Sequence, residues 1–205
     1  MILGWSCPVC GAAGRVPCDR CHAALTPASP VPPIEGVDAC VALLAYERIG
    51  RELVARLKYR NRRVGALWLG AGMAELARQF PVDVVTWAPA TPEHARERGF
   101  DHGQLLARRV ARGLGRPAVR LLTRARGAPL TGRSAGQRLA GPPLAPRPVE
   151  LRGAAVLLVD DVVTTGATIR TAAACLRRIG AGSVVALAAA YTPAPAFRQK
   201  VVTKR

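Results

Sequence analysis

Blocks of apolar and polar positions alternate along the chain, and their lengths and periods predict its secondary structure. Short apolar runs indicate buried strands at residues 37–46, 82–87, 156–159 and 183–190. Longer stretches with apolar positions three or four residues apart indicate helices at residues 47–59, 65–79, 103–114 and 169–179. Because helices alternate with strands, we predict an α/β fold with a mainly parallel sheet and flanking helices on both faces.

Three stretches lack any such period. Residues 26–36 carry four prolines and one glycine, which exclude regular structure and indicate a linker. Residues 88–101 form a predicted loop, and residues 123–148 are too long for an idle connection, so they predict a mobile active-site loop. The predicted parts are a small N-terminal unit (1–25), the linker (26–36), the main domain (37–193) and a basic C-terminal tail (194–205).

Length and composition allow one α/β domain of ordinary size and a small appendage, because half of the 205 residues are hydrophobic. The longest apolar stretches, 154–159 and 184–190, fall well short of the roughly 20 residues that a membrane-spanning helix needs. Residues 1–5 are too short for the apolar region of a secretion signal. We therefore expect a cytoplasmic protein with no membrane span.

The formal net charge of +17 predicts attraction to phosphate-bearing partners such as nucleic acid, nucleotides or pyrophosphate. Only three of the 30 basic residues are lysines, and Ala, Gly and Pro are abundant, which is also the composition that a GC-rich genome imposes. The net charge therefore supports a phosphate-bearing partner mainly in combination with a phosphate-binding motif elsewhere in the sequence.

Four N-terminal cysteines form two C-x-x-C pairs, Cys7 with Cys10 and Cys18 with Cys21. The two-residue gap lets both sulfurs of a pair turn toward one ion, and four thiolates suit tetrahedral Zn²⁺. Two disulfides are one alternative, which a chain without a secretion signal disfavours, and a redox C-x-x-C, the other, normally occurs singly. We predict a structural zinc ribbon, whose four protein ligands leave no open position for catalysis.

The most informative stretch is VLLVDDVVTTGAT, residues 156–168, in which an apolar strand runs into two adjacent acids. Asp160 and Asp161 are predicted to emerge at the carboxyl end of the strand, where open α/β sheets place their ligands. The next turn leads into a helix whose first N–H groups and dipole favour the phosphate of a phosphorylated sugar. This predicted phosphate loop consists of Thr164, Thr165, Gly166, Ala167 and Thr168. A buried strand before a threonine-capped helix is the alternative, but it leaves both carboxylates unexplained.

The same string resembles the phosphoribosyl pyrophosphate (PRPP) motif of type I phosphoribosyltransferases, which has four apolar residues, two acids, two variable residues and T-T-G-x-T. The resemblance implies the type I phosphoribosyltransferase fold. It also implies that Asp160 and Asp161 are catalytic acids facing the ribose hydroxyls, and that residues 164–168 wrap the 5′-phosphate. Mg²⁺ would then bind through the ribose and the pyrophosphate.

Further segments narrow this resemblance. The double C-x-x-C, the RERGF string within residues 95–101 and GRSAGQRLAGP at residues 132–142 resemble the ComF family, which joins a small zinc ribbon to a phosphoribosyltransferase domain. LKYRN at residues 57–61 also resembles a segment of that family, so the likeness runs nearly from end to end. It implies a role in natural competence, with single-stranded DNA and proteins of the DNA-uptake machinery as partners.

Arginines of the RERGF and GRSAGQRLAGP segments are candidates to bind pyrophosphate or nucleic-acid phosphate, because a guanidinium donates two parallel hydrogen bonds to phosphate oxygens. The candidates are Arg96, Arg98 and Arg133. The chain departs from the ComF pattern at Asp101-His102, where Asn-Gln is usual, and at Ala135-Gly136, where Arg-Ala is frequent. The departures leave the roles of these four positions open.

The function stays open between three classes. A transferase would displace pyrophosphate from the anomeric carbon of PRPP, with Mg²⁺ and guanidinium groups stabilising the departing charge. A non-catalytic module would bind single-stranded DNA through its phosphates, since aromatic residues for base stacking are only 4% of the chain. A nucleotide-salvage enzyme would need a base-recognition segment, which the sequence does not reveal. His94 and His102 lie in or beside the RERGF loop, where a lone histidine is more often a solvated side chain than a catalytic one.

Overall fold

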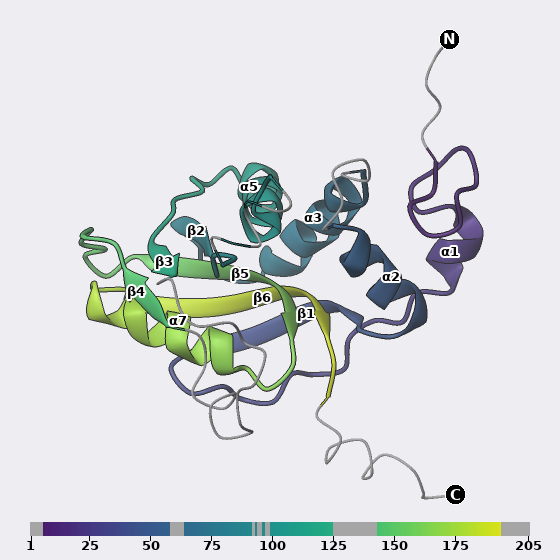
Figure 1. Cartoon of the computed structure of the whole chain (residues 1–205). Helices are drawn as coiled ribbons and strands as arrows, with labels where there is room; N and C mark the ends of the chain where they lie inside the picture. The colour runs from purple at the N-terminus through teal and green to yellow at the C-terminus, as the bar shows by residue number, and fades with distance from the viewer. Residues whose placement is uncertain are drawn as a thin grey trace, which may run out of the picture.

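The computed structural model describes residues 6–57, 64–91, 93, 96, 99–124 and 143–193. Its main domain is built on a four-stranded, parallel sheet with the strand order β1-β6-β5-β2 (Figure 1). The strands are β1 (Ala39–Ala45), β2 (Val84–Trp87), β5 (Ala155–Val163) and β6 (Ser183–Tyr191). The predicted parallel sheet is confirmed, and the central strands β5 and β6 are apolar runs because both of their faces are covered.

Helices cover both faces of the sheet (Figure 1). One face carries α2 (Arg48–Arg56), α3 (Val64–Ala77) and α5 (His102–Leu114), and the other carries α7 (Ala167–Arg178). Leu157 and Leu158 are neighbours in β5, yet Leu157 is buried on the three-helix face and Leu158 on the α7 face, because successive side chains of a strand alternate. Within the described part of the chain, no helix has the length and apolarity needed to cross a membrane.

The predicted loop at residues 123–148 is not irregular throughout. Its ends pair as β3 (Leu122–Arg124) and β4 (Leu144–Pro146), an antiparallel two-stranded sheet in which Leu122 lies opposite Pro146. Strands of three residues are too short to show a visible alternation, so the sequence pattern missed them. Residues 125–142, the rest of the predicted mobile loop, lie outside the described residues.

The proline-rich segment 26–36 contains no helix or strand element, as its composition predicts, yet it is packed against the main domain. Its first residue is tied to β1, because the backbone N–H of Ala45 donates to the carbonyl oxygen of Thr26 at 2.8 Å. Val31 and Ile34 pack against the apolar core on the α7 face of the sheet. The segment therefore forms part of the wall of the main domain on that side.

Candidate functional site

The acid pair lies at the edge of the sheet where the parallel strands have their carboxyl ends. β5 continues through Asp160 and Asp161 to Val163, farther than the apolar run 156–159 predicts. Asp160 is paired with Ala188 of β6 and Val162 with Ala190, so paired positions flank Asp161 on both sides. Both carboxylates therefore project from a regular strand near its end, and their backbone is held in place by the neighbouring strand.

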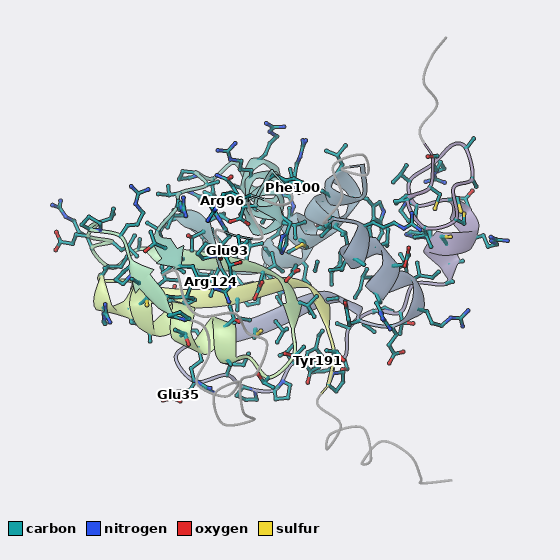
Figure 2. All side chains as sticks on the ribbon, in the orientation of Figure 1. Glu35, Glu93, Arg96, Phe100, Arg124 and Tyr191 are labelled. Atoms are coloured by element: carbon teal, nitrogen blue, oxygen red, sulfur yellow. The ribbon has the colours of Figure 1, made fainter. Side chains whose placement is uncertain are left out.

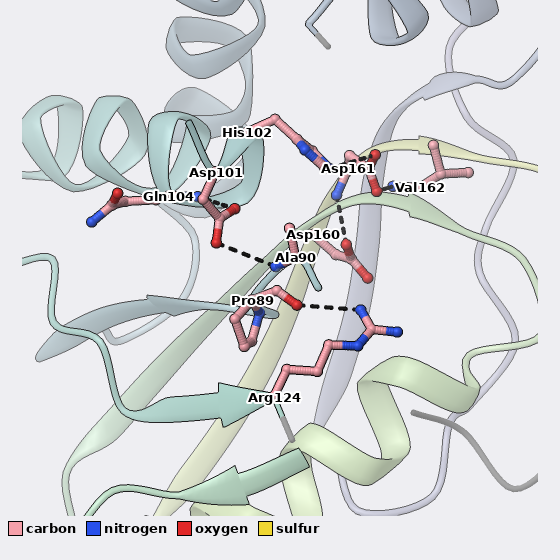
Figure 3. Close-up of polar contacts among 9 residues, drawn as sticks. All are labelled: Pro89, Ala90, Asp101, His102, Gln104, Arg124, Asp160, Asp161 and Val162. Atoms are coloured by element: carbon pink, nitrogen blue, oxygen red, sulfur yellow. Dashed lines mark hydrogen bonds and ion pairs between the residues drawn. The ribbon is translucent and has the colours of Figure 1, made fainter. Parts of the chain in front are cut away.

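Backbone N–H groups bind both carboxylates. The N–H of Asp161 donates to Asp160 Oδ1 at 2.8 Å, and the N–H of Val162 donates to Asp161 Oδ1 at 2.8 Å. The two side chains diverge: Asp161 points toward His102, and Asp160 lies on the side of Arg124 (Figure 3). The adjacent acids thus have different surroundings, although the sequence presents them as an equivalent pair.

Asp160 is held in a state that disfavours its negative charge. Burial raises the pKa of its carboxyl well above the usual range, and the negative charge of Asp161 raises it further. The N–H donated by Asp161 and the guanidinium of Arg124 act in the opposite direction. A group that neutralises negative charge beside Asp160, such as a bound cation, would relieve this cost.

His102 is the main correction to the sequence-based site. It was expected to be a solvated loop residue, but it is the first residue of α5 and its side chain is only 13% exposed. Its Nε2 lies 3.0 Å from Asp161 Oδ2, so Asp161 has a side-chain partner. The contact arises because β2 adjoins β5 in the sheet, and the connection that leaves β2 begins α5 beside the end of β5.

Asp101 fixes the position at which α5 begins. Its Oδ1 accepts the N–H of Gln104 at 3.2 Å, which is a helix N-cap. Its Oδ2 accepts from the backbone N–H of Ala90 at 3.2 Å (Figure 3) and from Trp87 Nε1 at 3.2 Å. Asp101 and His102 therefore each have a defined contact, and an aspartate directly before a helical pattern was a signal that could have predicted the cap.

The predicted phosphate loop connects β5 to α7. Gly166 is the N-cap of α7 and has a left-handed backbone (φ 73°), which glycine adopts without strain. Thr164 and Thr165 are exposed, and Thr168 is partly exposed, whereas Gly166 and Ala167 are buried. Hydroxyl groups are thus available beside the first N–H groups of α7, an arrangement that favours an anion.

A cavity of about 270 Å³ adjoins this loop. One wall is the proline-rich segment, whose Ile34 is in contact range of Gly166: a β carbon added at Gly166 would lie 2.7 Å from Ile34 Cδ1. The lining consists of Val31, Pro32, Pro33, Ile34, Val163, Thr164, Thr165, Gly166 and Tyr191. The segment that the sequence marked as a linker therefore contributes an apolar wall beside the threonine hydroxyls.

Among the described residues, the structure brings Arg124 to the acid pair, an arginine that the sequence did not single out. Arg124, in β3, donates from Nη1 to the carbonyl oxygen of Pro89 at 3.3 Å and acts on the charge of Asp160. Arg96 is largely exposed, and its Nη2 lies 3.8 Å from Glu93 Oε1 (Figure 2). Arg98 and Arg133 lie outside the described residues. No sequence signal linked Arg124 to the acids, because β3 was not predicted.

The four N-terminal cysteines are brought together as predicted. The four Sγ atoms of Cys7, Cys10, Cys18 and Cys21 all lie within 4.8 Å of one another. Within this cluster, Cys10 Sγ and Cys18 Sγ are 3.5 Å apart. A tetrahedral zinc ion with Zn–S bonds of about 2.3 Å places its sulfurs roughly 3.8 Å apart. The cluster can therefore hold a metal ion such as zinc.

The cysteine unit, which includes α1 (Asp19–Ala23), rests on the three-helix face near α2 and α3 (Figure 1). The ring of His22 meets the ring of Trp68 edge to face, with centroids 5.8 Å apart. Arg56 Nη2 donates to the carbonyl oxygen of Val9 at 3.4 Å. These contacts attach the unit to the main domain at α2 and α3, whereas the acid pair lies at the end of β5.

A match to a known protein family covers this site. The model of the family described as "Phosphoribosyl transferase domain" matches residues 101–203, which include the acid pair and the threonine loop. Among solved structures, the chain is similar to glutamine PRPP amidotransferase from B. subtilis complexed with ADP and GMP, with 24% identity and a TM-score of 0.46 over 66% of this chain and 30% of that chain.

It is also similar to adenine phosphoribosyltransferase from Leishmania tarentolae, with 21% identity and a TM-score of 0.40 over 60% of this chain and 56% of that chain. For a purine phosphoribosyltransferase from Pyrococcus horikoshii the identity is 17% and the TM-score 0.38, over 66% of this chain and 84% of that chain. The chain thus spans less than a third of the amidotransferase. The search of curated proteins found no match.

Proposed function

We propose, because the chain belongs to the phosphoribosyl transferase domain family, that it binds PRPP with Mg²⁺ and acts as a ComF-like protein in the uptake of single-stranded DNA. The observation that carries the proposal is that three features suited to binding sugars and phosphates lie together at the end of one strand. The acid pair of β5, the exposed threonine hydroxyls and the N-terminus of α7 follow one another directly in space. Hydroxyl donors of a sugar and an anionic phosphate are the groups that such an edge binds.

Each part of PRPP has a proposed partner. Asp160 and Asp161 accept hydrogen bonds from the ribose hydroxyls, since ionised carboxylates act only as acceptors. The loop 164–168 binds the 5′-phosphate through its hydroxyls and the first N–H groups of α7. Arginines bind the pyrophosphate or a nucleic-acid phosphate, and the candidates are Arg96, Arg98 and Arg133, joined now by Arg124.

The donor set fits Mg²⁺, which proteins hold through one or two carboxylates together with substrate phosphates. When bound, the ion supplies positive charge to the pyrophosphate. In the proposed transfer, the bond from the anomeric carbon to the pyrophosphate oxygen breaks, and pyrophosphate leaves with the electron pair. The nucleophile forms the new bond to that carbon with its own lone pair, and its proton passes to the departing pyrophosphate or to water. A zinc ion in the cysteine cluster would have a structural role, because four sulfur ligands leave no coordination position open for a substrate.

The binding proposal predicts a specific effect of the threonine loop. We expect Mg²⁺-dependent PRPP binding to the wild-type chain and an affinity about ten-fold lower for Thr165→Ala, because one hydrogen bond to a charged phosphate is lost. Isothermal titration calorimetry measures both values. Thr171→Ala is the matched control, since the Thr171 hydroxyl donates to the carbonyl oxygen of Ala167 inside α7. Equal affinities of the Thr165→Ala and wild-type chains would contradict the phosphate role.

Release of pyrophosphate from PRPP across a panel of nitrogen bases separates a transferase from a binding module. Turnover with any base identifies the chain as a transferase and names the acceptor. Binding of PRPP without turnover identifies a module that keeps the site as a ligand-binding domain. Neither outcome depends on the DNA-uptake role, which is tested separately.

Single-stranded DNA is the second candidate ligand, favoured by exposed arginines on and after α5. They follow one another at four-residue spacing: Arg108, Arg112, Arg116 and Arg120. We expect DNA affinity to fall at least ten-fold between about 50 and 200 mM salt, because binding through several phosphates releases counterions. Fluorescence anisotropy with a labelled oligonucleotide measures this, and the double variant Arg108→Glu, Arg112→Glu should bind more weakly at every salt concentration. A flat salt response would exclude phosphate-driven binding.

A further inference from the structure

We infer that His102 is a positioning residue of the PRPP site, which acts by holding the carboxylate of Asp161. The inference rests on the proposed function, because it assigns a role within the same site. It concerns a residue for which neither the PRPP motif nor the ComF resemblance supplies a role, since His102 replaces the glutamine that is usual at this place.

The contact is short and largely shielded from solvent. His102 Nε2 lies 3.0 Å from Asp161 Oδ2, and the two side chains are 13% and 17% exposed (Figure 3). An ionised carboxylate only accepts hydrogen bonds, so the imidazole donates an N–H from Nε2. The other oxygen of Asp161 accepts the N–H of Val162 at 2.8 Å. Both oxygens are therefore engaged, which fixes the plane of the carboxylate.

The imidazole is itself held by a fixed backbone. His102 follows Asp101, which caps α5 and accepts the N–H groups of Trp87 and Ala90. The start of α5 is thus tied to the end of β2, and β2 pairs with β5 along four residues. The backbone at position 102 is consequently held at a fixed distance from the acid pair. A residue in an untethered loop would not be.

Holding Asp161 in this way favours sugar binding by preorganisation. A carboxylate oxygen has two lone pairs, so an oxygen that accepts one N–H can also accept a hydroxyl. The terminal torsion of a free aspartate is broad, and ordering it on binding costs free energy. His102 removes that cost before the ligand arrives.

The test compares variants that keep or remove the donor at position 102. We expect His102→Ala to weaken Mg²⁺-dependent PRPP binding about 10- to 100-fold, the effect of losing a hydrogen bond to a charged group. His102→Gln should stay within about three-fold of wild type, because its amide N–H can reach the same oxygen. His102→Leu repeats the truncation with a side chain that fills the space, in case the alanine variant does not fold.

A second measurement needs no ligand. The ¹⁵N resonance of His102 Nε2 should report a protonated nitrogen in the wild-type chain and should shift in Asp161→Asn, while that of His22 stays unchanged. In the Asp161→Asn background, His102→Ala should lower PRPP affinity less than about three-fold, because residues that act as one unit are not additive.

Three results would overturn the role of His102: equal losses in His102→Gln and His102→Ala, wild-type affinity in His102→Ala and His102→Leu, or an Nε2 resonance insensitive to Asp161→Asn. The first would show that PRPP binding requires the imidazole itself and not only a donor to Asp161. Absence of PRPP binding by the wild-type chain would refute the proposed function, and with it the role in binding. The resonance would then still report whether the contact itself exists.

Discussion

Asp160→Asn should make the protein more stable and its binding of PRPP weaker. Asp160 is partly buried beside the negative charge of Asp161, and the loss of solvation and this charge both raise the pKa of its carboxyl well above the usual range. Asparagine has nearly the same shape, and its carbonyl oxygen can still accept the N–H of Asp161. It carries no charge, however, so the folded state no longer contains a disfavoured carboxylate.

The sign of the pH dependence follows from the direction of the shift. An acid whose pKa is higher in the folded state than in the unfolded state costs nothing at low pH, where both states hold the proton. Its contribution to stability is lost as the pH rises from the ordinary aspartate value, about 3.9, through the raised folded pKa. The advantage of Asp160→Asn should therefore be absent in acid, grow through this window and stay constant above it.

PRPP binding should respond in the opposite direction. The proposed ligand presents hydroxyl donors and a divalent cation, both of which need an ionised carboxylate. We expect Asp160→Asn to lower PRPP affinity about 10- to 100-fold at neutral pH and to remove the rise of wild-type affinity with pH. Urea denaturation and calorimetry at several pH values measure the two effects.

Glu150→Gln is a suitable control, because Glu150 is exposed at the opposite end of the main domain, just before β5. It should change neither quantity. A loss of stability in Asp160→Asn at neutral pH would show that the carboxylate is not under strain. Undiminished PRPP affinity would remove Asp160 from the binding site.

Cys21→Ser should abolish metal binding and loosen the N-terminal unit. Cys21 is buried in the four-sulfur cluster, and a hydroxyl is a far poorer ligand for zinc than a thiolate. Structural zinc contributes roughly 10–16 kcal/mol of binding free energy in small zinc-dependent peptides, so loss of one ligand is expected to unfold this unit. Metal analysis of the purified chain should fall from about one zinc to near none.

The main domain should tolerate this change. The cysteine unit contacts α2 and α3, whereas the acid pair lies at the end of β5 (Figure 1). PRPP affinity of Cys21→Ser should therefore stay within about three-fold of wild type. Cys175→Ser is the matched control: Cys175 is buried in the core on the α7 face, away from the other sulfurs, and should leave the zinc content unchanged. Full zinc content in Cys21→Ser would refute the four-cysteine site.

Much of the fold could be predicted from the sequence because long elements carry a visible period. The helix at 103–114 and the strand at 183–190 agree with α5 and β6 to within one residue at either end. β3 and β4 could not be predicted, since three residues do not define a period and their hydrogen bonds come from distant partners. Likewise, the prolines of 26–36 excluded regular structure but gave no sign that Ile34 packs beside Gly166.

The sequence by itself determined the local features of this protein: the strand that carries Asp160 and Asp161, the threonine turn into α7, and the paired cysteines of the N-terminal unit. These depend on residues close together in the chain, where spacing dictates geometry. Only the tertiary structure decided which distant side chains face the acids. His102 and Arg124 reach them from α5 and β3, because the order β1-β6-β5-β2 places the end of β2 beside the end of β5, and no local pattern encodes that order.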